Sequence, residues 1–238
     1  MEQFTEAAGK PVKIVGVPKA EILSQITTFG MKADLGTAIF IASSAFSLKK
    51  TWNGEPYITH CLFVADLNNE QLTDEEKTIG VLHDLIEDTD WDYADLKNIG
   101  FSDYVIEGVR ALTKDKESGE KYFDGMRRCS HNPIGRFFKR RDNKHNMDLT
   151  RSARMATAKQ KYHYHISATY HKAVDQGVIT AGTSLWKFLK MKQFSELLTA
   201  ENFPLVLAET SEPAPNWALR RFATEIAGRK MAGLAAHA

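Results

Sequence analysis

Apolar residues recur along most of this chain at spacings of three and four, the period of a helix that packs on one side. The clearest apolar face lies between positions 35 and 46 and consists of Leu35, Ala38, Ile39, Ala42, Ala45 and Phe46. The alternating pattern of strands is scarce. Its best example, residues 12–17, is short and flanked by prolines, so it is also compatible with a loop. We therefore expect an all-α fold.

Capping residues predict where several of these helices begin. Thr73 and Glu76 have the spacing of a capping box, which would open a helix that runs on past position 86. Ser102 can cap a second helix, and Asn132 followed by proline can open a third, because proline is tolerated in a first turn. A further helix is expected from about 156 to 174.

The pattern also suggests how the chain is divided. We expect an N-terminal segment over residues 1–30, a core over 31–178 and a C-terminal helical extension over 179–238. A stretch rich in proline and small residues at 210–215 resembles a linker, and a terminal helix is expected over 217–236. The extension has enough apolar residues for packed helices, which could cover the core, form a dimer face or dock a partner. The oligomeric state stays open.

Composition narrows the class of protein. The chain has 238 residues, of which 43% are hydrophobic and 26% charged, as in ordinary globular proteins. Lys and Arg total 31 and Asp and Glu total 30, which argues against a protein that grips bulk nucleic acid or an anionic membrane. Two cysteines exclude a disulfide framework. No apolar run approaches the roughly 20 residues of a membrane span, so we expect a soluble cytoplasmic protein.

A histidine and several carboxylates cluster at the end of one predicted helix. His83 and Glu87 are four residues apart and would share a face of a helix, while Asp84 and Asp88 would share the neighbouring face. Clustered carboxylates repel one another, and a bound divalent cation would relieve that repulsion. A solvated acidic helix end is the other interpretation, and it is the better one for a His-Asp pair taken alone.

Four sequence motifs in a fixed order favour the interpretation that a cation is bound. They are Lys49-Lys50-Thr-Trp-Asn-Gly54-Glu-Pro-Tyr57-Ile-Thr-His60, Val81-Leu-His-Asp-Leu-Ile-Glu-Asp-Thr89, Val109-Arg-Ala-Leu-Thr-Lys114 and Lys139-Arg-Arg-Asp-Asn-Lys-His-Asn-Met147. In these motifs, residues 38–148 resemble an HD-domain phosphohydrolase, and more narrowly the (p)ppGpp hydrolase domain of the RelA/SpoT homologue family. The nearest subclass is the small alarmone hydrolase of phage, plasmid or antitoxin type. The resemblance implies an HD-domain helical bundle.

The resemblance also implies roles for individual residues. The implied metal ligands are His60, His83, Asp84 and Asp142. The implied ion is Mn²⁺, although Fe²⁺ or another divalent ion would also suit these ligands. Glu87 and Asp88 are the implied general acid and base, without a decision on which is which. The implied substrate-binding residues are Lys49, Lys50, Asn146 and Tyr170, and Tyr162 or Tyr164 could take the place of Tyr170.

The implied activity is removal of the 3′-pyrophosphate from (p)ppGpp, which gives GDP or GTP and pyrophosphate. An adenosine alarmone, or a tRNA end that an antitoxin restores, would need the same chemistry. The motifs are also compatible with a general HD phosphohydrolase that acts on nucleotide mono- or triphosphates, and with a non-catalytic nucleotide sensor. The expected partners are the nucleotide and a toxin-type synthetase that shares it. No membrane is expected, and no nucleic acid apart from a tRNA end.

Two residues differ from the family pattern, and a third belongs to the pattern without being an expected ligand. Cys61 stands where the family has proline, and Arg141, next to Arg140, stands where it has a small residue. His145 belongs to the last motif but is not an expected ligand, so we assign it to packing or to contact with a ligand. Some arginines and lysines of the basic run at 136–144 are expected to balance carboxylates or bind phosphate.

Overall fold

The computed structural model describes residues 4–7, 10–13, 16–51, 54–115, 118–148 and 161–223. This part of the chain is helical apart from an antiparallel pair of strands, β1 (Phe4–Ala7) and β2 (Lys10–Lys13). The all-α expectation is therefore confirmed, and the candidate strand at 12–17 contributes only its first two residues to β2. None of the helices in the described ranges is long and apolar enough to cross a membrane.

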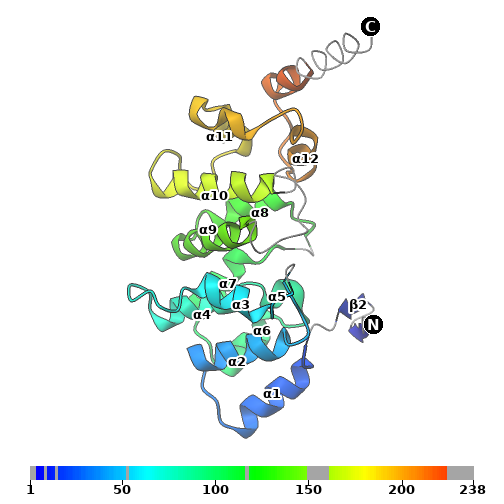
Figure 1. Ribbon diagram of the computed structural model, residues 1–238, viewed down its shortest axis with the longest axis vertical. Helices are drawn as coiled ribbons and strands as arrows, with labels where there is room; N and C mark the ends of the chain where they lie inside the picture. Colours follow the sequence, from blue (N-terminus) through cyan, green and yellow to red (C-terminus); the bar gives the residue numbers. More distant parts are fainter. Residues whose placement is uncertain are drawn as a thin grey trace. The chain divides into compact units, whose positions relative to one another are not determined.

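The chain forms two compact units, and each is built from two stretches of sequence. The first unit comprises Met1–Lys114 and Asn132–Met155, and the second comprises Asp115–His131 and Ala156–Ala238. Figure 1 shows the helices of both units. The division at 30 and 178 that we expect from the sequence stays a prediction.

The first unit is built mainly from helices. They are α1 (Lys19–Thr28), α2 (Leu35–Ala45), α3 (Ile58–Ala65), α4 (Asp74–Leu82), α5 (Leu85–Asp88), α6 (Tyr93–Ile99), α7 (Asp103–Leu112) and α9 (Pro133–Met147). The α4 helix contacts α2, α3 and α7, and α9 contacts α3 and α7. The α2, α3, α4, α7 and α9 helices each contribute a fully buried side chain: Ile41, Val64, Leu82, Val109 and Phe138, respectively.

The predicted caps are present. Thr73 and Glu76 form the capping box at the start of α4, where each side chain accepts a hydrogen bond from the other residue's backbone N–H. Ser102 accepts from the backbone of α7, and Asn132 accepts from the backbone of α9. Each cap satisfies a backbone donor that the first turn of a helix leaves without a partner.

The helix that begins at the capping box is shorter than predicted. The α4 helix ends at Leu82, and α5 begins at Leu85. Between them, His83 Nδ1 lies 2.8 Å from Gly80 O, the carbonyl that the N–H of Asp84 would reach in an unbroken helix. We attribute the break to this contact, because a side chain that occupies a backbone acceptor competes with the helix.

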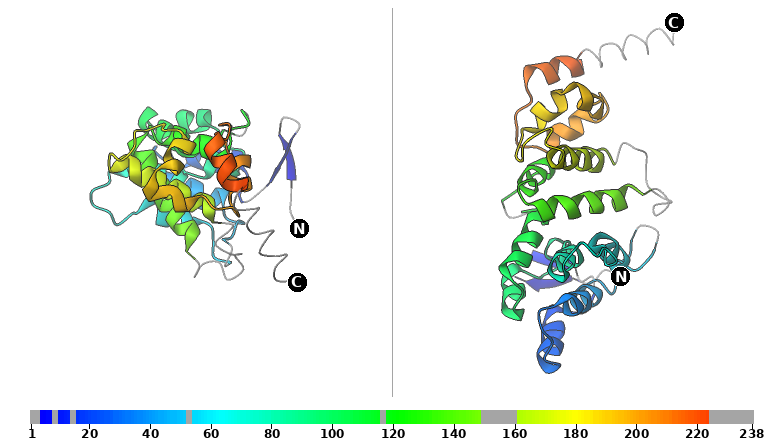
Figure 2. Two further views of the ribbon diagram at one scale, coloured as in Figure 1. Left: turned by 90° about the horizontal axis from the view of Figure 1, so that it is seen from above. Right: turned by 90° about the vertical axis from the view of Figure 1, so that its left-hand side faces the viewer.

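The second unit has a separate apolar core. Its described elements are α8 (Tyr122–Cys129), α10 (Tyr162–Asp175), α11 (Leu185–Lys190), the 3₁₀ helix η3 (Lys192–Leu197), α12 (Phe203–Ala208) and a helical segment at 216–223. Figure 2 shows α10 in yellow-green, followed by the short helices toward the red end. Phe123, Tyr170 and Phe188 are fully buried in this core. The parts of the predicted helices at 156–160 and 224–236 lie outside the described residues.

Candidate metal centre

Two helices of the first unit approach each other closely where the histidines lie. His60 is on α3, and His83 directly follows α4. Gly80 of α4 faces the α3 backbone so closely that a Cβ atom on it would lie 2.5 Å from the Cα atom of Ala65. The absence of a side chain at Gly80 therefore lets the two helices bring His60 and His83 together.

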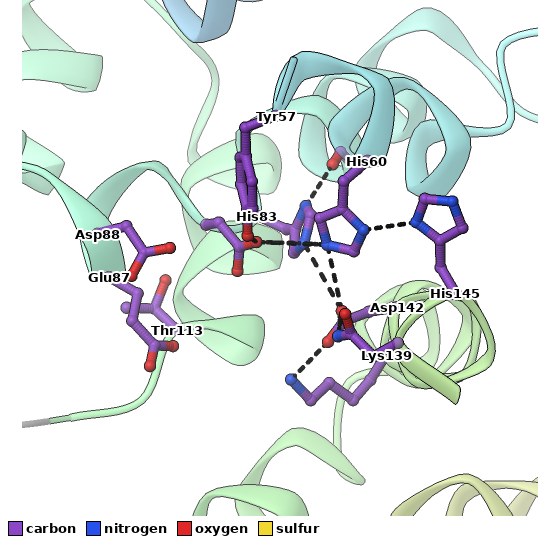
Figure 3. Close-up of polar contacts among 12 residues, drawn as sticks. Tyr57, His60, His83, Glu87, Asp88, Thr113, Lys139, Asp142 and His145 are labelled. Atoms are coloured by element: carbon purple, nitrogen blue, oxygen red, sulfur yellow. Dashed lines mark hydrogen bonds and ion pairs between the residues drawn. The ribbon is translucent and has the colours of Figure 1, made fainter. Parts of the chain in front are cut away.

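The nitrogen and oxygen atoms of three residues converge on one point. His83 Nε2 lies 2.9 Å from Asp84 Oδ2 and 3.2 Å from His60 Nε2, and His60 Nε2 lies 3.5 Å from Asp84 Oδ2. Asp142 on α9 adds Oδ1 at 3.4 Å from His60 Nε2 and 4.0 Å from His83 Nε2. Figure 3 shows the side chains of His60, His83 and Asp142 pointing toward one another.

These atoms suit a cation. Ligand atoms about 2.1 Å from an ion lie about 3 Å apart when they subtend a right angle at it, close to the separations among His60, His83 and Asp84. The three residues could therefore hold a metal ion. Asp142 Oδ1 lies beside the two histidines, and its assignment as a fourth ligand stays a prediction.

Burial and charge act together on the protonation of these groups. His60, His83 and Asp142 are 3%, 2% and 4% exposed. Burial opposes the charged form of His60, but its contacts with Asp142 and Asp84 outweigh burial and raise its pKa to about 9. Burial likewise favours neutral carboxyls, yet the neighbouring histidines hold the pKa of Asp84 well below its usual range. Without a cation, a proton on His60 thus balances part of the carboxylate charge.

A further polar contact orients each of the four side chains. His83 Nδ1 contacts Gly80 O, which leaves Nε2 pointing into the cluster. Asp142 accepts hydrogen bonds from Asn146 Nδ2 at 2.6 Å and Lys139 Nζ at 2.8 Å. Burial favours the neutral form of Asp142, but the charge of Lys139 is the main influence that outweighs burial and lowers the pKa of this carboxyl.

Asp84 and His60 are contacted by residues of the first and the last of the four sequence motifs. Tyr57, the residue before α3, donates its hydroxyl hydrogen to Asp84 Oδ2 at 2.6 Å. His145 on α9 places Nδ1 2.6 Å from Nδ1 of His60. The sequence alone does not single out Tyr57 as a site residue, although its position three residues before His60 in the motif is the signal that could have pointed to it.

The predicted acid pair, Glu87 and Asp88, lies three and four residues after Asp84, in the single turn of α5. Asp88 forms an ion pair with Lys49, whose Nζ lies 3.4 Å from the centroid of the Tyr57 ring. Glu87 Oε2 accepts a hydrogen bond from the backbone N–H of Lys114 at 3.3 Å. In Figure 3, both carboxylates lie on one side of the histidines and His145 lies on the other.

The predicted substrate-binding residues have different surroundings. Lys49 is half-buried between Asp88 and Tyr57, whereas Lys50 is exposed. Asn146 contacts Asp142. Tyr170 lies in the core of the second unit, where its hydroxyl donates to Thr183 O at 2.6 Å. The assignment of these residues to the substrate stays a prediction.

The departures from the family pattern have structural explanations. Arg141 donates hydrogen bonds to Phe63 O and Val64 O at the end of α3 and pairs with Asp66, so its guanidinium secures the helix end. Cys61 is fully buried, and burial raises the pKa of its thiol. A buried thiol of raised pKa is a packing residue and a poor nucleophile.

Comparison with known proteins found no matching family model and no matching curated protein. Any proposed function has to account for three features of the centre. They are the cluster of two imidazoles and two carboxylates, the pair of carboxylates in the turn that follows, and the lysine beside that pair.

Proposed function

We propose that this protein is a metal-dependent hydrolase that removes the 3′-pyrophosphate from (p)ppGpp or a related alarmone. One observation carries the proposal: ligand-type atoms of His60, His83, Asp84 and Asp142 converge from distant parts of the chain beside the carboxylates at 87 and 88. A solvated acidic helix end would need none of this convergence. The resemblance of the four motifs to alarmone hydrolases adds the substrate class.

Mn²⁺ is the ion that we propose for the centre, with Fe²⁺ or another divalent ion as the alternative. Mixed imidazole and carboxylate ligands suit ions that keep positions open for water, whereas closed structural zinc sites are mostly built from thiolates with or without imidazole. When bound, the ion supplies positive charge to a phosphoryl oxygen and makes coordinated water more acidic.

The reaction requires that the attacking water loses a proton and that the ribose 3′ oxygen gains one. Water attacks the phosphorus atom bonded to the ribose 3′ oxygen, the bond between that phosphorus and the 3′ oxygen breaks, and pyrophosphate leaves. A carboxylate at 87 or 88 accepts the proton of the attacking water, and the other carboxyl donates a proton to the 3′ oxygen. The two differ in their contacts, since Asp88 pairs with Lys49 and Glu87 accepts from the backbone.

Lys49 is suited to receive an anionic substrate. Its ammonium is held over the Tyr57 ring and beside Asp88, so a phosphate that arrives next to the acid pair meets a positioned positive charge. Cation–π contact and the ion pair restrict the side chain before substrate binds. Lys50 is exposed and available to a second phosphate group.

The test is a substrate panel with a ligand variant as control. Purified protein is stripped of metal and incubated with ppGpp, GTP, dGTP and GMP, with and without Mn²⁺, and the products are separated by ion-exchange chromatography. We expect Mn²⁺-dependent conversion of ppGpp to GDP and pyrophosphate, and no conversion by His83→Ala. Faster hydrolysis of dGTP or GMP would replace the alarmone proposal by a general phosphohydrolase. Nucleotide binding without hydrolysis would indicate a sensor.

A further inference from the structure

We infer that Tyr57 and His145 are positioning residues of the metal centre, and that each holds one ligand in the orientation that a cation needs. The inference rests on the metal binding of the proposed function and not on its substrate. Neither residue supplies an atom to the cluster of His60, His83 and Asp84. Both contact an atom of that cluster's side chains at 2.6 Å.

Tyr57 acts on Asp84. Its hydroxyl donates to Oδ2, the same oxygen that lies 2.9 Å from His83 Nε2 and therefore faces the ion position. Asp84 lies in the break between α4 and α5, where no continuous helix restrains its side chain. The hydrogen bond from Tyr57 restricts the rotation of this carboxylate about its side-chain bonds. The carboxylate oxygen keeps a second lone pair for a cation.

His145 acts on His60. A neutral imidazole carries its hydrogen on one nitrogen and a lone pair on the other. His60 can offer Nε2 to a cation only when its hydrogen is on Nδ1, and that hydrogen then points to Nδ1 of His145 at 2.6 Å. When His145 carries its own hydrogen on Nε2, its Nδ1 accepts this hydrogen bond, and the contact then favours the form of His60 that binds metal. Gly80 O does the same for His83.

Packing is the competing explanation for His145. Its ring stacks on Phe63 with centroids 3.9 Å apart and planes inclined by 6°, and the residue is 7% exposed. A phenylalanine would preserve this stack and remove the acceptor. An asparagine would remove the ring and keep an acceptor oxygen near the position of Nδ1. The two substitutions therefore separate the hydrogen bond from the packing.

Tyr57 has an equally specific substitution. Tyr57→Phe keeps the ring under Lys49 and its edge contact with Phe46, where the ring centroids are 5.0 Å apart. Only the hydroxyl that reaches Asp84 is removed. Tyr104→Phe is the matched control, because the Tyr104 hydroxyl donates to Glu76 at the exposed surface of the same unit.

The measurement is the affinity of the metal-free full-length chain for Mn²⁺ by isothermal titration calorimetry, with the visible spectrum of added Co²⁺ as a report on coordination. Tyr57→Phe and His145→Phe should each bind Mn²⁺ roughly 10–100-fold more weakly, the usual effect of losing a contact to a ligand. His145→Asn should bind more tightly than His145→Phe, and Tyr104→Phe should match the wild type. Thermal unfolding by circular dichroism identifies any variant that fails to fold.

Three results would overturn the inference. One is wild-type affinity in both Tyr57→Phe and His145→Phe, which would leave the proposed hydrolase standing. Another is tighter binding by His145→Phe than by His145→Asn, because packing would then be the function of His145. The third is a wild-type chain that binds neither ion. Absence of ppGpp hydrolysis with intact metal binding would contradict the proposed substrate and leave this inference unaffected.

Discussion

Gly80→Ala is expected to damage the metal centre, although none of the three atoms nearest to the added Cβ belongs to a proposed ligand. The added Cβ would lie 2.5 Å from Ala65 Cα and 2.8 Å from Phe138 Cε1. Favourable contact between carbon atoms needs about 3.5–4.0 Å, so α3 and α4 would have to separate by about 1 Å. The phenylalanine ring can turn aside, whereas the α3 backbone can move only as a whole.

The magnitude follows from two opposed effects. Alanine is favoured over glycine inside a helix by about 1 kcal/mol, and overpacking a core costs about 1–3 kcal/mol. The two effects together leave a net loss of up to about 2 kcal/mol of unfolding free energy. The same displacement would lengthen the 3.2 Å separation of His60 Nε2 and His83 Nε2. Metal–ligand distances vary by only about 0.2 Å, so Mn²⁺ affinity should fall as well.

Urea unfolding followed by circular dichroism and calorimetric titration with Mn²⁺ measure both effects. Gly36→Ala on α2 is the matched control, since the nearest atom to its added Cβ is Asp34 Oδ1 at 3.4 Å. The control should keep its Mn²⁺ affinity and lose no stability. A Gly80→Ala protein with unchanged stability and affinity would refute the reasoning that this glycine sets the distance between the histidines.

Further substitutions test separate parts of the site and fold. Asp142→Ala should abolish Mn²⁺ binding and turnover, and full activity with a chelator present would contradict this. Glu87→Gln combined with Asp88→Asn should leave Mn²⁺ bound and lower the rate by about 10²–10⁴-fold, and loss of the metal instead would make them ligands. Arg141→Ala should cost about 2 kcal/mol of unfolding free energy by releasing the end of α3, with an unchanged KM for ppGpp. Burial favours the neutral form of Glu120, but the hydrogen bond from Arg128 outweighs burial and lowers the pKa of this carboxyl. The ionised Glu120 therefore stabilises the fold at pH values above its pKa in the unfolded chain, about 4.3. This stabilisation is lost as the pH falls through its lower pKa in the folded protein. The gap in unfolding free energy between wild type and Glu120→Gln should therefore narrow from pH 7 toward pH 3.

The sequence by itself determined the local structure. Three helices of the first unit, α4, α7 and α9, begin where Thr73, Ser102 and Asn132 predict, because a capping side chain bonds to a backbone N–H within three residues. It also determined the set of candidate ligands, since a histidine or carboxylate that binds metal is recognisable by residue type and motif. The all-α class follows from the period of three and four, which is a property of each helix alone.

Only the tertiary structure decided how these residues meet. The hydroxyl of Tyr57 reaches Asp84 across 27 residues of chain, and Nδ1 of His145 reaches His60 across 85. Arg141 departs from the family pattern, and its guanidinium binds the end of α3. No local pattern encodes these contacts, because they depend on the distance between packed helices. The distance between α3 and α4 is small because Gly80 has no side chain. This role of Gly80 becomes visible only in the structure, where its Cα faces the backbone of α3.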